Sequence, residues 1–172
     1  LVLTLTPHST RCLMARYSIL HLTLIILHIA TAAAWFGLGL RIAGRARSIV
    51  EANGPARVAL AEDGARSVWL MNVFMALTLV FSIAAFVVGG HFNTYGPAYH
   101  SAITFIVVLT LLQFFVIRPG WSTLQANADP DTGDADAAES AKSKVAIGTG
   151  VGHLLWFVLL GLMFWDQFAA AL

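Results

Sequence analysis

The sequence predicts an all-α integral membrane protein: a bundle of four transmembrane helices with both termini on the non-cytoplasmic side. Three observations lead to this prediction. The chain is 58% hydrophobic and only 11% charged, with a mean hydropathy of +0.77, whereas a soluble domain is about one quarter charged. It contains uncharged apolar runs long enough to cross a bilayer. Its basic residues are concentrated in two of the predicted connections.

The first span is predicted at residues 17–40. No charged residue lies between Tyr17 and Leu40, and about 20 apolar residues in a helix cross a hydrocarbon core of roughly 30 Å. The run is too long for the apolar region of a secretory signal peptide. Residues 1–13 precede Met14, which leads directly into this span, and they are interpreted as an extension from an upstream start rather than as part of the native protein.

Three further spans are predicted at residues 68–88, 98–117 and 145–166. The uncharged stretch from Ser67 to Ile117 is interrupted by Gly-Gly-His-Phe-Asn-Thr-Tyr-Gly-Pro at residues 89–97, and glycine, asparagine and proline together indicate a turn. Residues 119–144 carry several acidic residues together with Pro130 and Gly133. This segment is predicted to be a solvated cytoplasmic linker.

The placement of basic residues predicts the orientation, because short loops rich in lysine and arginine stay on the cytoplasmic side. Eight of the ten basic residues lie in the first and third connections: Arg41, Arg45, Arg47, Arg57, Arg66, Arg118, Lys142 and Lys144. We therefore expect a multi-pass protein of a bacterial-type inner (cytoplasmic) membrane, with the lipid bilayer as its main partner. A net charge of +1 argues against nucleic acid, whose binding requires a basic stripe.

The positions of aromatic and polar residues agree with the predicted four-span arrangement. Five rings are expected at the membrane interfaces, where amphipathic aromatic side chains prefer to lie: Trp69, Tyr95, Tyr99, Trp121 and Trp165. Two helical stripes of polar and aromatic residues should face the bundle interior. The first comprises Tyr17, His21, His28, Thr31 and Trp35, and the second Thr149, His153, Trp156, Met163 and Gln167. Gly148 and Gly152 should allow a neighbouring helix to approach closely.

Two groups of histidines are candidate ligands. Helical rise places His28 and His153 at nearly the same depth near mid-membrane, with Trp35 and Trp156 available to flank a flat ring. Haem iron takes axial imidazole and needs an apolar slot between helices, so this pair is a candidate site for b-type haem. His21, His91 and His100 form an outer group, which suits copper or zinc. Alternatively, each histidine only forms hydrogen bonds between helices.

Other chemistries find little support in the sequence. No Cys-His attachment motif is present, which excludes covalent haem. The glycine-rich segment at residues 148–152 lies inside an apolar span and lacks the lysine of a phosphate-binding loop. No serine or cysteine has a base at usable spacing, and no carboxylate lies inside a span, since Asp166 only closes the fourth one. No catalytic residue is therefore assigned.

The segment from His28 through Ala33 to Trp35 and Phe36, followed by Gly37 and Gly39, resembles the first span of HemJ-type protoporphyrinogen oxidases and of copper-resistance D-type membrane proteins. The segment from Tyr99 to Phe105 also looks like the start of their third helix. The resemblance implies a small helical membrane protein that carries b-type haem, with His28 as axial ligand. This sequence has Ala102 where the family has a lysine that matters for oxidase activity, and it lacks the proline-glycine motif of the second span. The resemblance therefore does not extend to the oxidase reaction.

Three functions remain open from the sequence. The first is a b-type haem-binding membrane protein with an electron-transfer role, using His28 and His153. The second is a non-catalytic small subunit or structural partner of a larger respiratory or photosynthetic membrane complex. The third is an outer-face copper-binding or copper-transport protein that uses His21, His91 and His100.

Overall fold

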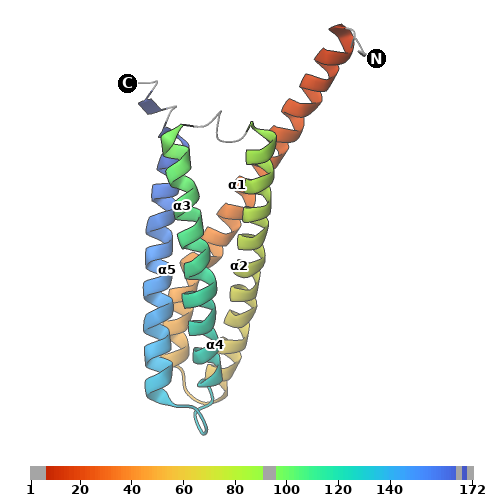
Figure 1. Ribbon diagram of the computed structural model, residues 1–172. Helices are drawn as coiled ribbons and strands as arrows, with labels where there is room; N and C mark the ends of the chain where they lie inside the picture. Colours follow the sequence, from red (N-terminus) through yellow and green to blue (C-terminus); the bar gives the residue numbers. More distant parts are fainter. Residues whose placement is uncertain (1–6, 91–95, 166–167, 170–172) are drawn as a thin grey trace.

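A computed structural model describes residues 7–90, 96–165 and 168–169, with side chains from Tyr17 onward. The elements are α1 (Pro7–Glu51), α2 (Pro55–Val88), α3 (Pro97–Leu112), the π-helical turn η2 (Gln113–Ile117), α4 (Arg118–Ala126) and α5 (Ala135–Met163). Four segments are long and apolar enough to cross a membrane: Tyr17–Glu51, Pro55–Val88, Pro97–Ala126 and Ala135–Met163. They form an up-and-down bundle (Figure 1). The predicted all-helical fold, with four helices long and apolar enough to span a membrane, is therefore confirmed.

The two ends of the bundle carry different connections. We call one half of the bundle the basic half and the other the hairpin half, after the connections at their ends. The basic half contains the α1–α2 connection at residues 52–54 and the α4–α5 connection at residues 127–134. The hairpin half contains the turn between α2 and α3. The N-terminal part of α1 extends beyond the other helices at the hairpin end (Figure 1).

The α2–α3 turn was predicted closely. Helix α2 ends at Val88, and Gly90 adopts a φ of 102°, a left-handed backbone conformation that glycine adopts without steric cost. Helix α3 begins at Pro97, where the missing N–H of proline would have no intrahelical partner in any case. The central residues of the turn, His91 and Tyr95 among them, lie outside the described residues.

The helices of the basic half are longer than the predicted spans. Helix α1 continues past Leu40 to Glu51, and α5 begins at Ala135, because alanine, arginine and lysine favour helix in water as well as in lipid. Most of the segment 119–144, predicted as a linker, is therefore helical. Asp134 caps α5 by accepting hydrogen bonds from the N–H groups of Asp136 and Ala137 at 2.9 and 3.1 Å.

The third span changes its helical pitch in the middle of the membrane segment. Residues Gln113–Ile117 form a π-helical turn directly before Arg118 and Pro119. Proline lacks the N–H that would bond the carbonyl one turn earlier and crowds that carbonyl, and a single π turn is a common way for a helix to absorb such a defect. The turn changes which face of the following residues meets the bundle.

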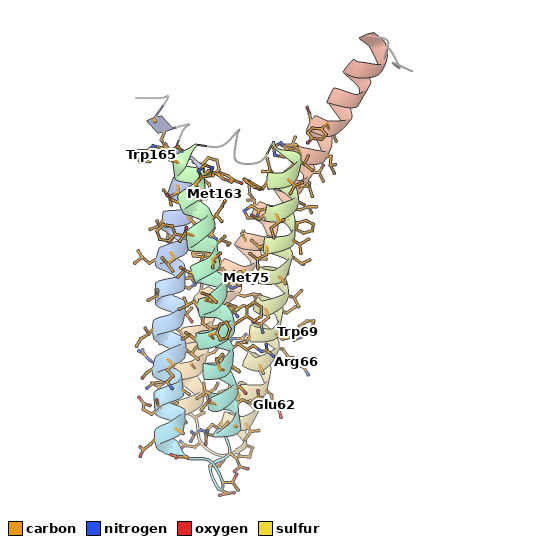
Figure 2. The ribbon with its side chains drawn as sticks, in the orientation of Figure 1. Glu62, Arg66, Trp69, Met75, Met163 and Trp165 are labelled. Atoms are coloured by element: carbon orange, nitrogen blue, oxygen red, sulfur yellow. The ribbon has the colours of Figure 1, made fainter. Side chains whose placement is uncertain are left out.

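The core of the basic half is built around Trp121. This side chain is 2% exposed, and its ring fills the space left by Gly64, since a Cβ on Gly64 would lie 1.9 Å from Trp121 Cζ2. Its indole N–H donates to the Ala61 carbonyl at 3.3 Å. Trp121 thus packs inside the bundle and does not face its outer surface; its level relative to a membrane interface stays a prediction. Trp69 and Trp165, by contrast, are 62% and 58% exposed on the outside of the bundle (Figure 2).

Candidate functional site

The polar stripe of α1 faces the bundle interior, as predicted. Thr31 and Trp35 are buried and His28 is half-buried, whereas Tyr17, above the main bundle, is exposed. Helix α2 lies alongside this stripe, and the hydroxyl oxygens of Thr31 and Thr78 are 3.1 Å apart. The stripe thus forms the contact between α1 and α2 in the hairpin half.

His28 is held by the backbone of α2. Its Nδ1 lies 3.2 Å from the carbonyl oxygen of Thr78. Because a carbonyl oxygen can only accept, Nδ1 must carry the proton in this contact, which leaves a lone pair on Nε2. Histidines that ligate metals are commonly held in this way, with one ring nitrogen donating to a carbonyl and the other directed to the metal. His28 is therefore in a suitable tautomer for metal ligation.

His153 has a different environment, between α5 and α1. Its Nε2 is buried and has no hydrogen-bond partner among the described residues. The ring meets Phe36 edge-on, with centroids 4.9 Å apart, and it occupies the space next to Gly39, where an added Cβ would lie 2.9 Å from Nε2. Phe36 also stacks on Trp156 at 4.3 Å. His153 is thus part of an aromatic cluster that packs against a glycine.

The structure does not bring His28 and His153 together. His153 lies against Gly39, which follows His28 by eleven positions on the same helix, a separation of about 16 Å along the axis. One iron cannot accept both imidazoles in this arrangement, so the expectation that they lie at the same depth is wrong. It assumed that the first and fourth spans end at the same level, whereas α1 extends well beyond α5 at the hairpin end (Figure 1).

Trp35 takes part in a buried polar network that the sequence did not reveal. Its indole N–H donates to Gln113 Oε1 at 3.0 Å, and Gln113 Nε2 donates to Asn72 Oδ1 at 2.8 Å. Gln113 has no exposed surface and lies in the π-helical turn. The network joins α1, α2 and η2. Its signal in the sequence was the pair of amide side chains Asn72 and Gln113 inside the uncharged run of the second and third spans. The role of Trp35 beside a flat ring stays a prediction.

The two glycines of α5 have the predicted role. A Cβ on Gly148 would lie 3.1 Å from side-chain atoms of Val116 and Ile117, and one on Gly152 would lie 3.4 Å from Leu112 and 3.5 Å from the Trp35 ring. Thr149, between them, is buried and donates to the Val145 carbonyl. Close approach of the third span to α5 therefore depends on these glycines.

The predicted outer histidine group is only partly described. His21 is half-buried on α1 and His100 is exposed at the start of α3, while His91 lies outside the described residues. Within the described part of the chain, no three or more histidine, cysteine, aspartate or glutamate residues are grouped so that they could hold a metal ion. Copper or zinc binding by His21, His91 and His100 remains a prediction.

Comparisons with protein-family models, with curated proteins and with solved structures find no match to this chain.

Proposed function

We propose that the protein is a membrane-embedded b-type haem protein with an electron-transfer role, in which His28 is the axial ligand supplied by the chain. The observation that supports this proposal is the contact between His28 Nδ1 and the Thr78 carbonyl, which leaves Nε2 able to ligate iron. The family resemblance of the first span implies the same residue. His153, which the sequence had paired with His28, takes a packing role against Gly39 in this proposal.

In this proposal the haem lies between helices beside His28, in the hairpin half. The residues buried in this half include the small side chains Thr31, Thr78, Ala85 and Ala102, and also the larger Met75 and Leu159. Haem requires an apolar slot between helices and an imidazole at its edge. Bound there, it would supply a one-electron couple, and the chain would supply the ligand and exclude water.

Haem content of variants tests this proposal. The protein is expressed with a haem supply and purified in detergent, and a reduced-minus-oxidised spectrum is recorded for wild type, His28→Ala and His153→Ala. We expect haem in wild type and His153→Ala, and at least a tenfold loss in His28→Ala. The variant Thr78→Ala retains the backbone carbonyl and should keep its haem. Full haem content in His28→Ala, or folded wild-type protein without haem, would overturn the proposal.

The second candidate is a non-catalytic subunit of a larger membrane complex, and the environment of His153 favours it. An imidazole buried against Gly39 is accommodated as a packing side chain without a ligand. In this case wild type purifies without haem, and His153→Gln folds as well as wild type, because the change removes no hydrogen bond of the buried Nε2.

We also propose that both termini lie on the non-cytoplasmic side. The proposal rests on the arginines of the α1–α2 region and the absence of lysine and arginine from the α2–α3 turn. A reporter fused after Leu172 should behave as non-cytoplasmic, and one inserted at Thr132 in the α4–α5 connection as cytoplasmic. The reverse result would mean that the bundle is inserted the other way.

A further inference from the structure

The basic half contains a groove that has no histidine in its lining. It is a hollow of about 450 Å³ between α1 and α5. Helix α1 contributes Ala43, Gly44 and Arg47 to its lining, and α5 contributes Lys142, Ser143, Ala146 and Ile147.

The polarity of the groove changes along its length. Helices α1 and α5 run in opposite directions (Figure 1), so Arg47 and Lys142 both lie toward the connections, and Ala43 and Ile147 both lie toward the middle of the bundle. One end is therefore cationic and the other apolar. Ile147 is largely exposed, and so is Leu154, two turns further along the same face of α5, so the apolar end continues onto the outer surface of the bundle.

The two cationic side chains of the groove differ in whether they have a partner within the protein. Lys142 forms an ion pair with Glu139, one turn earlier on α5. Arg47 is exposed and has no ion-pair or hydrogen-bond partner within the part of the chain that the structure describes. A guanidinium with free donors can bind a phosphate through two parallel hydrogen bonds.

The groove lies where a membrane surface is expected. Arg45, two residues before Arg47 on α1, bonds Asp63 at 2.6 Å and Ser67 at 2.8 Å across to α2. Trp69 lies two residues after Ser67 on α2 and is exposed, and Figure 2 shows Glu62 and Arg66 on the side of Trp69 nearer the connections. Tryptophan on a lipid-facing surface prefers the headgroup level, so this level of the bundle corresponds to the boundary between headgroups and acyl chains.

Packing among the described residues does not require a glycine at position 44. A Cβ at this position would meet nothing within 4 Å, although a glycine inside a helix costs roughly 1 kcal/mol relative to alanine. Gly64 and Gly120, in the same half, instead make room for other side chains of the protein. No described residue of the chain therefore fills the space beside Gly44.

We propose that this groove binds an anionic phospholipid. The headgroup phosphate lies against Arg47 and Lys142, and an acyl chain follows the apolar end past Gly44, Ala146 and Ile147. Basic pockets between transmembrane helices are a known way of recognising anionic headgroups. A zwitterionic lipid offers the same acyl chain but no net negative charge, so the site discriminates through its two cations.

Native mass spectrometry of the full-length protein in detergent tests this proposal with phosphatidylglycerol, phosphatidylcholine and inorganic phosphate as probes. We expect one phosphatidylglycerol to be retained preferentially. Retention should fall about fivefold in Arg47→Gln, and at least as much in Gly44→Leu, which fills the groove. Arg118→Gln removes another exposed arginine, and Gly161→Leu fills another glycine position with nothing within 4 Å; both controls should retain lipid as wild type does.

Three outcomes would overturn the proposal. Equal retention of phosphatidylcholine would show that the cations do not select the lipid. Unchanged retention in Gly44→Leu, with a folded helical spectrum, would place the lipid elsewhere. Displacement of phosphatidylglycerol by inorganic phosphate at equal concentration would show that the site binds a soluble anion without using the apolar end. A variant that fails to fold is replaced by Gly44→Val, for which the same reduction is expected.

Discussion

The two halves of the bundle achieve burial by different means. In the basic half, large side chains from several helices interlock: Ile42, Ile49, Ile117, Trp121 and Leu124 are all almost completely buried. In the hairpin half, α1 and α2 are joined through threonine hydroxyls and a histidine–carbonyl contact, and α2 and α3 diverge (Figure 1). The proposed haem site is assigned to the hairpin half because His28 lies there.

Lipid explains why such a difference is tolerated. Water would penalise apolar side chains left exposed in the hairpin half, but lipid tails solvate them as well as other side chains do. Stability is then provided by close packing where helices touch, and by the few polar groups that need partners. The free energy of unfolding should therefore respond to changes in side-chain volume in the basic half, and to the loss of polar side chains in the hairpin half.

Gly64→Ala should have the largest effect on stability. The new methyl would overlap Trp121, which is buried on all sides, and overpacking of a closed core costs about 3 kcal/mol at the upper end of its usual range. The free energy of unfolding, measured by titration with a denaturing detergent, should fall by that amount. Gly37→Ala is the matched control, since a Cβ there meets nothing within 4 Å, and it should be neutral or slightly stabilising. Equal effects of the two variants would contradict the packing of Trp121.

Gln113→Leu should have an intermediate effect. It removes both bonds of the amide and leaves the Trp35 indole N–H and the Asn72 amide without this partner. Such bonds contribute about 0.6 kcal/mol each on average and at most about 1.7, so we expect a loss of about 1–2 kcal/mol in the same titration. Gln125→Leu, on the exposed surface of α4, should change little. A neutral Gln113→Leu would mean that the network does not hold η2 in place.

Gly39→Ala should have the smallest effect, and this effect should depend on His153. The added Cβ would lie 2.9 Å from His153 Nε2, so the imidazole must shift, at an expected cost of about 1 kcal/mol. In a His153→Ala background the same change should be nearly neutral, because the obstacle is gone. A double-mutant cycle measures this coupling. Additive effects would show that His153 does not pack on Gly39.

The sequence predicted the architecture well because hydrophobic length, turn composition and polar periodicity are local properties. The breaks at Gly90 and Pro97, the inward stripe of Thr31 and Trp35, and the spacing of Gly148 and Gly152 can all be recognised from neighbouring residues in the chain. The relative depth of residues on different helices is not local. It depends on how far α1 extends beyond α5, which no single span encodes.

The same limit applies to the partners of individual side chains. Trp121 follows the predicted end of the third span, and the sequence did not predict that it packs inside the bundle. Its burial depends on Gly64 in another helix, and the helical continuation past Pro119 brings it there. Gln113 was missed for the related reason that its partners, Trp35 and Asn72, come from two other elements of the chain.

The central claim is that His28 and His153 belong to different sites and that only His28 ligates iron. Electron paramagnetic resonance of the oxidised, haem-loaded wild type reports the axial ligands directly. With one imidazole from the chain, we predict a high-spin ferric signal that is lost in His28→Ala and unchanged in His153→Ala. A low-spin signal of two imidazoles, converted to high spin by His153→Ala, would show that both histidines bind one iron and would contradict the account.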